Sequence, residues 1–377
     1  MKIVIAFDSF KGSLTALQAC EACRDGVLQA DPSALCRLIP LGDGGEGTME
    51  AVSSVLGLRR VSCQTVGPLG DPLEAGYFVS DDGRSAYIDL ASASGHSLIP
   101  EGRRDVMRAT TRGTGLMMAH AIAAGARRII LGLGGSATVD GGMGLLSALG
   151  AGFFDDLGAE VLPGGAALSR VARIDTSALP CGVTVEALCD VDNPLLGPCG
   201  AARVFAPQKG ASPAQVLELE RGLARFAAAA AQSGCHADPA APGCGAAGGV
   251  GYGLSLLPGA TLSRGIDKVL GLLRFSESVA GADLVITGEG CLDSQSLHGK
   301  VPVGVLRIAT RHSVPVVAVA GSVLHSAALD AAGFAGIFSV TPGPCTLAEA
   351  MRPETAMTNI RTTAREIIRM INNSTNR

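Results

Sequence analysis

Short apolar runs and helical patterns alternate at the start of the chain. Residues 2–7 form an apolar run that predicts a buried parallel strand, and a polar glycine loop follows it. Apolar residues then recur at helical spacing. Thr15 and Gln18 have the spacing of a capping box at the start of this helix, and the Asp-Pro pair at 31–32 predicts its end. A second apolar run, 35–41, predicts another strand, so the chain opens as a strand, helix and strand.

The same alternation returns near the C-terminus. Apolar runs predict strands at 283–287, 314–320 and 336–340, and a helical pattern covers 301–310. These three strands and the two at the N-terminus have the length and composition of buried parallel strands. We therefore expect all five to share one parallel sheet.

The middle of the chain has a different pattern. Residues 75–89 and 153–162 resemble hairpins, each folded around a turn that contains Asp and Gly. The predicted fold class is α/β, with a doubly wound, Rossmann-like parallel sheet that is discontinuous in sequence and an inserted mixed α/β domain. The expected boundaries are 1–61 plus 267–377 for the first domain and 62–266 for the inserted one. We expect the active site in the cleft between them.

Composition narrows the class of protein. Hydrophobic residues make up 47% of the 377 residues and charged residues 17%, which is typical of an ordered globular protein. A formal net charge of −4 and the absence of Trp argue against a nucleic-acid partner. No apolar run is long enough for export or for a membrane span, and 11 scattered Cys indicate a reducing compartment. We expect a cytoplasmic protein with small-molecule partners, which can also form a homo-oligomer.

Carboxylates in glycine-rich segments follow several predicted strands. Asp8 and Ser9 begin a loop that contains Lys11, and Asp43 begins the segment Asp-Gly-Gly-Glu-Gly with Gly44 and Gly45. Parallel strands end at the same sheet edge, so these segments should meet there, where loop amides and lysines can bind phosphate. Phosphoryl transfer requires donors for phosphate and carboxylates for Mg²⁺. The remaining candidates of this kind near the C-terminus are Glu289, Asp293, Gln295 and Lys300.

The middle of the chain carries further candidates. A predicted strand at 129–133 leads into a glycine loop with Gly134 and Ser136, which could bind phosphate or a carboxylate substrate. Asp190 follows another apolar run and is a candidate base. The remaining candidates of the middle segment are Asn193, Gln208 and Lys209.

The glycine loop in the middle also suggests a different enzyme. Gly132, Gly134 and Ala137, with Asp155 and Asp156 further on, imitate a dinucleotide fingerprint and would indicate an NAD(P)-dependent hydroxy-acid dehydrogenase. Such a fingerprint normally occupies the first βα turn of a βαβ unit, whereas residues 153–162 look like a hairpin. The kinase interpretation is therefore favoured over this alternative.

Taken in order, these segments resemble the bacterial glycerate kinase family. The resemblance rests on DSFKGSLTA at 8–16, DGGEGT at 43–48, GGSATVDGG at 134–142, DVDNPLLG at 190–197, APQKGA at 206–211 and TGEGCLDSQSLHGK at 287–300. It implies a two-domain α/β enzyme that uses ATP and Mg²⁺ to convert D-glycerate to 2-phosphoglycerate. A glycerate 3-kinase and a non-catalytic metabolite-binding protein stay as alternatives.

The chain departs from the family pattern at three positions. Phe7 stands where Pro is usual, Val139 where Asn is usual and Cys291 where Arg is usual. The last departure matters most, because an arginine offers bidentate hydrogen bonds to phosphate that a thiol cannot. Lys300 or Arg264 could compensate for its loss.

The residue types and the resemblance together give a hypothesis for the site. Catalytic roles fall to Asp190, Lys11 and Lys209. Asp43, Glu289 and Asp293 are the predicted metal ligands. The predicted substrate- or nucleotide-binding residues are Asp8, Ser9, Gly44, Gly45, Gly134, Ser136, Asn193, Gln208, Gln295 and Lys300.

Overall fold

The computed structural model describes residues 1–375, apart from the side chains of Gln295, His298, Ser374 and Thr375. The chain divides into two compact units. Unit 1 comprises residues 1–43, 50–57 and 264–377, and unit 2 comprises residues 44–49 and 58–263. Within the described part of the chain, no helix has both the length and the apolar character required to cross a membrane.

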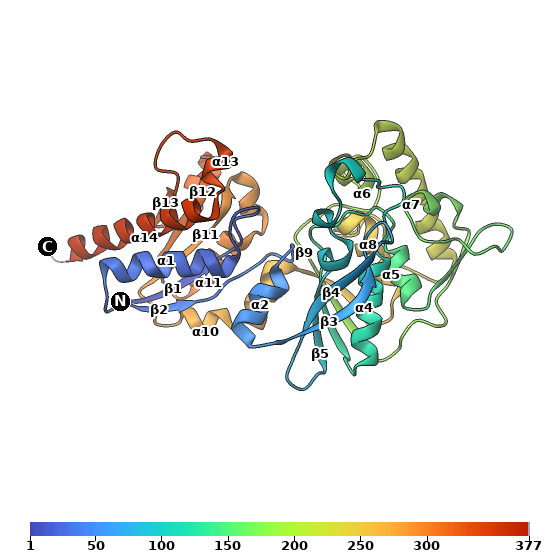
Figure 1. Ribbon diagram of the computed structural model, residues 1–377, viewed down its shortest axis with the longest axis horizontal. Coiled ribbons are helices and arrows are strands. Elements are labelled where there is room, and N and C mark those ends of the chain that lie inside the picture. The colour runs from blue at the N-terminus through green and yellow to red at the C-terminus, as the bar shows by residue number, and fades with distance from the viewer. Residues whose placement is uncertain (376–377) are drawn as a thin grey trace. The chain divides into compact units, whose positions relative to one another are not determined.

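Unit 1 is built on a five-stranded parallel sheet (Figure 1). Its order is β13-β12-β11-β1-β2, so the N-terminal strands complete a sheet formed largely by the C-terminal part of the chain. This confirms the single discontinuous parallel sheet predicted from the apolar runs. The strands are β1 (Lys2–Phe7), β2 (Leu35–Leu38), β11 (Leu284–Leu292), β12 (Val316–Val323) and β13 (Gly336–Ser339).

Helices cover the sheet of unit 1. Alternate side chains of β1, among them Ile3 and Ile5, join a buried cluster with α1 (Ala16–Ala30) and α14 (Pro353–Thr375). The predicted capping box at Thr15 starts α1, and Asp31 follows its last residue. The helix α11 (Val301–Arg311) packs against β1, β11 and β12, and its residues take no part in that cluster. The other helices are α2 (Thr48–Leu56), α9 (Gly265–Leu272), α10 (Phe275–Val279), α12 (Ala327–Asp330) and α13 (Leu347–Ala350).

Several strand ends differ from the prediction by two residues or more. The strand expected at 35–41 ends at Leu38, although the backbone N–H groups of Ile39 and Leu41 still donate to the carbonyl oxygens of Ile5 and Phe7 in β1. The strand expected at 283–287 continues to Leu292, because β12 pairs with it through Glu289 and Cys291. Gly288 permits this pairing, since a Cβ there would lie 1.8 Å from a backbone carbonyl oxygen of β12. Glu289 therefore lies in a strand and not in the predicted loop.

Unit 2 contains a six-stranded mixed sheet of order β10-β9-β6-β5-β4-β3. The predicted hairpin at 75–89 is present as the antiparallel pair β4 and β5, whereas β5, β6 and β9 run parallel. This agrees with the predicted mixed α/β character. The strands are β3 (Arg59–Val66), β4 (Pro72–Val79), β5 (Ser85–Asp89), β6 (Arg128–Gly132), β9 (Thr184–Cys189) and β10 (Ala260–Arg264).

The second predicted hairpin, at 153–162, is only partly correct. Its first strand is β7 (Gly152–Phe154), whose ladder partner is β8 (Arg173–Asp175), and only an isolated bridge joins Phe154 to Glu160. The helices of unit 2 pack around a core that includes the aromatic rings of Phe153, Phe226 and Tyr252. They are α3 (Ala91–Ser94), α4 (Arg112–Ala123), α5 (Met143–Ala148), α6 (Ala201–Phe205), α7 (Pro213–Gln232) and α8 (Ala246–Gly253).

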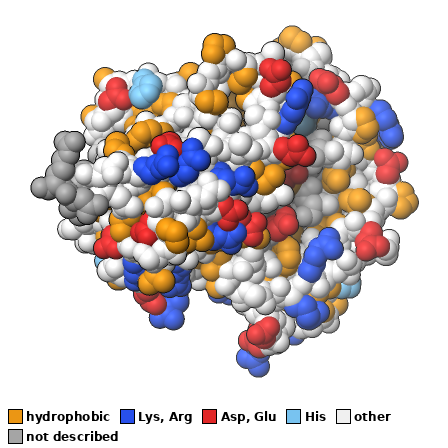
Figure 2. Space-filling view, turned by 60° about the vertical axis from the view of Figure 1, so that its left-hand side comes forward, with side chains coloured by type: hydrophobic (Ala, Val, Ile, Leu, Met, Phe, Trp, Pro, Cys, Tyr) orange, Lys and Arg blue, Asp and Glu red, His pale blue; other side chains and the backbone are white. Residues whose placement is uncertain are grey.

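Basic and acidic side chains are interspersed over the face of the molecule drawn in Figure 2. Several exposed pairs are close in space, such as Arg274 with Glu277 and Arg365 with Glu366. Pairs of this kind contribute little to stability because water screens them.

Candidate functional site

In unit 1, buried carboxylates gather at the carboxyl edge of the parallel sheet. Asp8 directly follows β1, and its Oδ1 accepts a hydrogen bond of 2.7 Å from the backbone N–H of Ser9. Burial, together with the nearby negative charges of Asp43 and Glu289, raises the pKa of Asp8 to about 8. Lys11 opposes this effect. Three predicted site carboxylates therefore lie within electrostatic reach of one another.

Glu289 combines burial with an incomplete set of partners. Its residue is 6% exposed, and its Oε2 lies 3.7 Å from the Nζ of Lys300. Its Oε1 is buried and has no hydrogen-bond partner among the described residues. Burial raises the pKa of Glu289, and the positive charge of Lys300 is among the influences that lower it. A buried carboxylate oxygen with no donor favours the binding of a cation or of a donor from a ligand.

The other predicted residues of unit 1 have local roles as well. Asp293 is the N-cap of the short 3₁₀ helix Ser294–His298, and its Oδ1 accepts from the backbone N–H of Ser296 at 3.0 Å. Lys11 is exposed in the turn after β1, next to Gly12, whose φ of +74° favours glycine. The side chains of the candidates Gln295 and His298 lie outside the described residues.

In unit 2, two glycine loops contact each other through their backbones. The N–H of Gly134 donates to the carbonyl oxygen of Gly44 at 2.9 Å. A Cβ on Gly134 would lie 2.3 Å from the Cα of Gly45, so glycine is required there. Asp89, at the end of β5, accepts from the backbone N–H groups of Gly47 and Met49 and thereby fixes the first loop. Close packing of the two backbones therefore explains in part why these loops contain glycine.

Lys209 is a buried amine held by the second glycine loop. Its Nζ donates to the Oγ of Ser136 and to the carbonyl oxygen of Thr138, both at 2.7 Å. Burial lowers the pKa of Lys209 to about 7, although the negative charge of Asp140 opposes the shift. A lysine that titrates near neutral pH and lies beside a glycine loop is typical of a functional site.

Asp140 organises this loop and was missed as a functional residue by the sequence analysis. Its fully buried carboxylate accepts from the hydroxyl groups of Thr110 and Thr111 and from the backbone N–H groups of Thr111, Gly142 and Gly144. An acidic residue among glycines gave no signal that distinguished it from the rest of the loop. His96 and Arg104, described below, gave no motif signal either.

The candidate base and its neighbours lie at the carboxyl end of β9. Asp190 directly follows this strand and is half-buried. Asn193 stabilises the next turn, because its side-chain amide donates to the carbonyl oxygen of Cys199 at 2.7 Å. The carbonyl oxygen of Asn193 accepts from Gly245, at the start of a glycine-rich segment. Gln208 is exposed beside Lys209.

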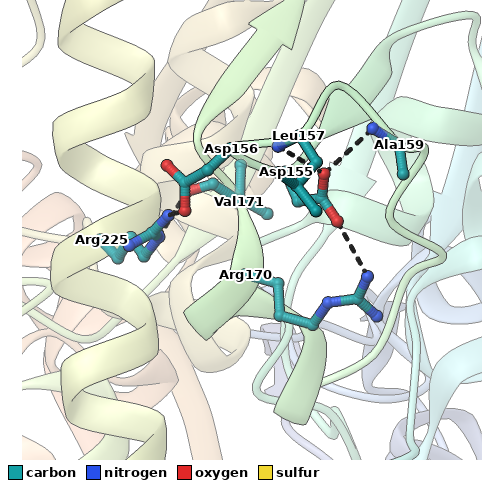
Figure 3. Close-up of polar contacts among 7 residues, drawn as sticks. All are labelled: Asp155, Asp156, Leu157, Ala159, Arg170, Val171 and Arg225. Atoms are coloured by element: carbon teal, nitrogen blue, oxygen red, sulfur yellow. Dashed lines mark hydrogen bonds and ion pairs between the residues drawn. The ribbon is translucent and has the colours of Figure 1, made fainter.

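The two aspartates of the imitated dinucleotide fingerprint serve a turn (Figure 3). Oδ1 of Asp155 accepts from the backbone N–H groups of Leu157 and Ala159, and its Oδ2 pairs with Arg170 at 3.1 Å. Asp156 pairs with Arg225, whose Nε also donates to the carbonyl oxygen of Val171. Both carboxylates therefore have structural partners, which argues against their binding a ribose in a dehydrogenase.

The three departures from the family pattern have different surroundings. Phe7 is buried and stacks on Phe10, and Val139 is buried in the core of unit 2. Cys291 is exposed, and its Sγ accepts a hydrogen bond from the Oγ of Ser322 at 3.3 Å. Only the third departure therefore changes an exposed position close to a predicted site residue, Glu289.

Comparisons with known proteins show the family of the chain. The model of the glycerate kinase family matches residues 3–372. The chain is 45% identical to a glycerate kinase of Bacillus subtilis, with 97% of each chain covered, and 43% identical to a glycerate 2-kinase of Escherichia coli, with 93% of each covered. A crystal structure of a Salmonella typhimurium LT2 protein assigned as glycerate kinase 2 superposes with a TM-score of 0.87 at 44% identity, over the full length of both chains.

Proposed function

The chain belongs to the glycerate kinase family, and we propose that it transfers the γ-phosphoryl group of ATP to the 2-hydroxyl group of D-glycerate. The E. coli relative is a glycerate 2-kinase by name, which supports this regiochemistry. The observation that carries the proposal is the set of mutually repelling carboxylates around Asp8, beside two lysines, at the edge of a parallel sheet. Such a set suits a nucleotide with a divalent cation.

We propose that unit 1 binds the phosphates of ATP. Lys11 and Lys300 supply positive charge for them, and the amides of the turn after β1 supply hydrogen-bond donors. Ser9 and Gln295 are further nucleotide-binding candidates of this unit. Position 291 holds Cys where the family usually has Arg, so Lys11 and Lys300 are the principal positive charges proposed for the phosphates.

The carboxylates of unit 1 fit Mg²⁺. Among the described residues, no group of three or more His, Cys, Asp or Glu side chains is arranged to hold a metal ion. Mg²⁺, however, usually binds through one or two carboxylates together with substrate phosphates and waters. The partnerless Oε1 of Glu289 and the raised pKa of Asp8 are both features that a cation would relieve. Asp43 and Glu289 would hold the ion, with Asp293 near them, and when bound it neutralises charge on the β- and γ-phosphates.

Unit 2 supplies the group that accepts the proton. The oxygen of the glycerate 2-hydroxyl attacks the γ-phosphorus, the bond from that phosphorus to the bridging oxygen of ADP breaks, and the hydroxyl proton passes to the carboxylate of Asp190. Lys209 adds positive charge through the Ser136 loop. The loose transition state mainly requires orientation and neutralisation of charge, so a carboxylate is a sufficient base.

The proposal is tested by a coupled assay and by the product. ADP release that depends on both D-glycerate and Mg²⁺ is expected, and phosphorus NMR should identify 2-phosphoglycerate. A product phosphorylated at the 3-position would contradict the regiochemistry. ATP-independent reduction of NAD(P) with glycerate would contradict the kinase. A location in the cytoplasm and a homo-oligomeric state belong to the same proposal, and fractionation and light scattering test them.

We also expect a pH-dependent effect on stability when Lys209 is replaced. The unfolded chain keeps this proton up to about pH 10.5, whereas the folded protein releases it near pH 7. Between these values the unfolded state binds more protons, so the wild-type protein gains stability as the pH rises. Lys209→Met lacks this gain, and its stability relative to the wild type should therefore fall by about 2–5 kcal/mol from pH 7 to pH 10.

Urea unfolding at several pH values measures this difference. All 3 tyrosines, Tyr77, Tyr87 and Tyr252, lie in unit 2 and the chain has no Trp, so tyrosine fluorescence reports on the unit that contains Lys209. Lys11→Met, which removes an exposed lysine of unit 1, is the control and should show no such trend. A difference between Lys209→Met and the wild type that does not change with pH would show that Lys209 is charged in the folded protein.

A further inference from the structure

Three basic side chains of unit 2, His96, Arg104 and Lys209, lie within electrostatic reach of one another and form what we call the cationic cluster. Burial lowers the pKa of His96, and the positive charges of Arg104 and Lys209 lower it further. Arg104 also packs beside the residue that follows Lys209, because a Cβ on Gly210 would lie 3.2 Å from the Cβ of Arg104. Like charges held this close repel one another unless an anion lies among them.

The backbone fixes this cluster to the second glycine loop. His96 donates its N–H to the carbonyl oxygen of Gly135 at 2.8 Å, and Ala137 donates to the carbonyl oxygen of Ser94 at 2.9 Å. These two bonds make an isolated antiparallel bridge between Gly95 and Ser136. Lys209 bonds the same loop through Ser136 and Thr138. Backbone bonds therefore set the position of His96 relative to Ser136, and the side-chain bonds of Lys209 set the position of its amine.

Two donors beside the cluster lack acceptors among the described residues. The Nε of Arg104 is buried and has no hydrogen-bond partner there. Its guanidinium lies 3.8 Å from Glu101, whose side chain is 89% exposed, and such a pair holds an arginine weakly. The Ser136 hydroxyl accepts a bond from Lys209, so its own proton must be donated elsewhere, and no described residue accepts it. Buried donors without acceptors are costly in the absence of a ligand.

We propose that Arg104, together with Ser136 and with Lys209 behind it, binds the carboxylate group of the organic-acid substrate. The planar guanidinium matches a carboxylate, the Ser136 hydroxyl donates to it, and Lys209 holds that hydroxyl in place from behind. A singly charged carboxylate is favoured over a polyphosphate because Glu46 lies within electrostatic reach of His96 and bonds the hydroxyl of Ser97 at 2.9 Å. This inference rests on the proposed function, and it adds the subsite that recognises the carboxylate group of the substrate.

Steady-state kinetics of Arg104→Gln test the subsite. The KM for D-glycerate should rise 10- to 100-fold, which corresponds to the loss of a charge-assisted pair. The KM for ATP should change less than twofold. Arg103→Gln is the matched control, because this neighbouring arginine is 64% exposed and meets only an exposed Asp71 at 3.6 Å. A rise in the KM for ATP with an unchanged KM for D-glycerate would overturn the proposal and assign the cluster to a phosphate.

The neutral analogue glyceramide separates recognition of the carboxylate from general damage to the enzyme. The wild-type protein should prefer D-glycerate to glyceramide, and Arg104→Gln should lose at least tenfold of that preference. Arg104→Lys keeps the charge but not the planar fork, so an intermediate preference is expected. If all three proteins show the same preference, Arg104 does not bind the carboxylate.

Calorimetric titration with D-glycerate, without nucleotide, tests the subsite separately from turnover. We expect the wild-type protein to bind D-glycerate at least tenfold more tightly than Arg104→Gln. This result supports the carboxylate subsite even if the wild-type protein forms no phosphorylated product. In that event the proposed function fails and the subsite stands. Equal binding by the wild type and Arg104→Gln, or no binding by either, would overturn the subsite. The unchanged KM for ATP, or an unchanged tyrosine-fluorescence unfolding curve, shows that the variant is folded.

Discussion

Asp190→Asn should lower kcat by about 10²- to 10⁴-fold while the KM values for D-glycerate and ATP change little. An asparagine side chain has nearly the same size as aspartate but cannot accept the hydroxyl proton. The position supports this role, because Asp190 directly follows a parallel strand of unit 2 and is half-buried. Loss of a group that acts only in the transition state lowers kcat and kcat/KM together.

Asp192→Asn is the matched control for this experiment. It makes the same chemical change two residues further along the same turn, at an exposed position, and kcat should stay within about threefold of the wild type. An Asp190→Asn enzyme with wild-type turnover would exclude Asp190 as the proton acceptor. Equal losses in both variants would instead indicate that the turn as a whole is sensitive to charge.

The parallel sheet of unit 1 was predictable because its strands are buried on both faces. A strand of this kind is an uninterrupted apolar run, and the runs near the two ends of the chain are unusually clear. The capping box at Thr15 marked the start of α1 because its two side chains are only three residues apart. The sequence was less informative where a strand is extended by pairing with a residue far away in the chain. Glu289 is an example, because its pairing with β12 makes it part of β11.

The candidate site was predictable only where residues stand in recognisable loops. Asp8 and Asp43 come after β1 and β2, and Glu289 lies near the end of β11. The order of these strands in the sheet brings the three carboxylates within electrostatic reach of one another. His96 begins one short 3₁₀ helix and Arg104 directly follows another, and neither position belongs to a motif. What makes Arg104 notable is a buried donor without an acceptor, and that property depends on tertiary packing that no local pattern encodes.

Asp140→Ala should produce the largest loss of stability, lowering the free energy of unfolding by about 3–5 kcal/mol. The buried N–H groups of Thr111, Gly142 and Gly144 and the two threonine hydroxyls would lose their shared acceptor at once. Because Asp140 is fully buried, those donors would lose their acceptor away from bulk solvent. Activity should also fall, because the loop that positions Ser136 and Lys209 depends on this carboxylate.

Urea unfolding followed by tyrosine fluorescence measures the effect in unit 2, which contains every tyrosine. Asp82→Ala is the control, because Asp82 also accepts hydrogen bonds within a turn but is exposed, so water can replace it and the loss should stay below about 1 kcal/mol. Asp140→Asn keeps one acceptor oxygen and should fall between the two. If Asp140→Ala unfolded at the same urea concentration as Asp82→Ala, the glycine loop would be held by its backbone packing against Gly44 and Gly248 and not by the carboxylate.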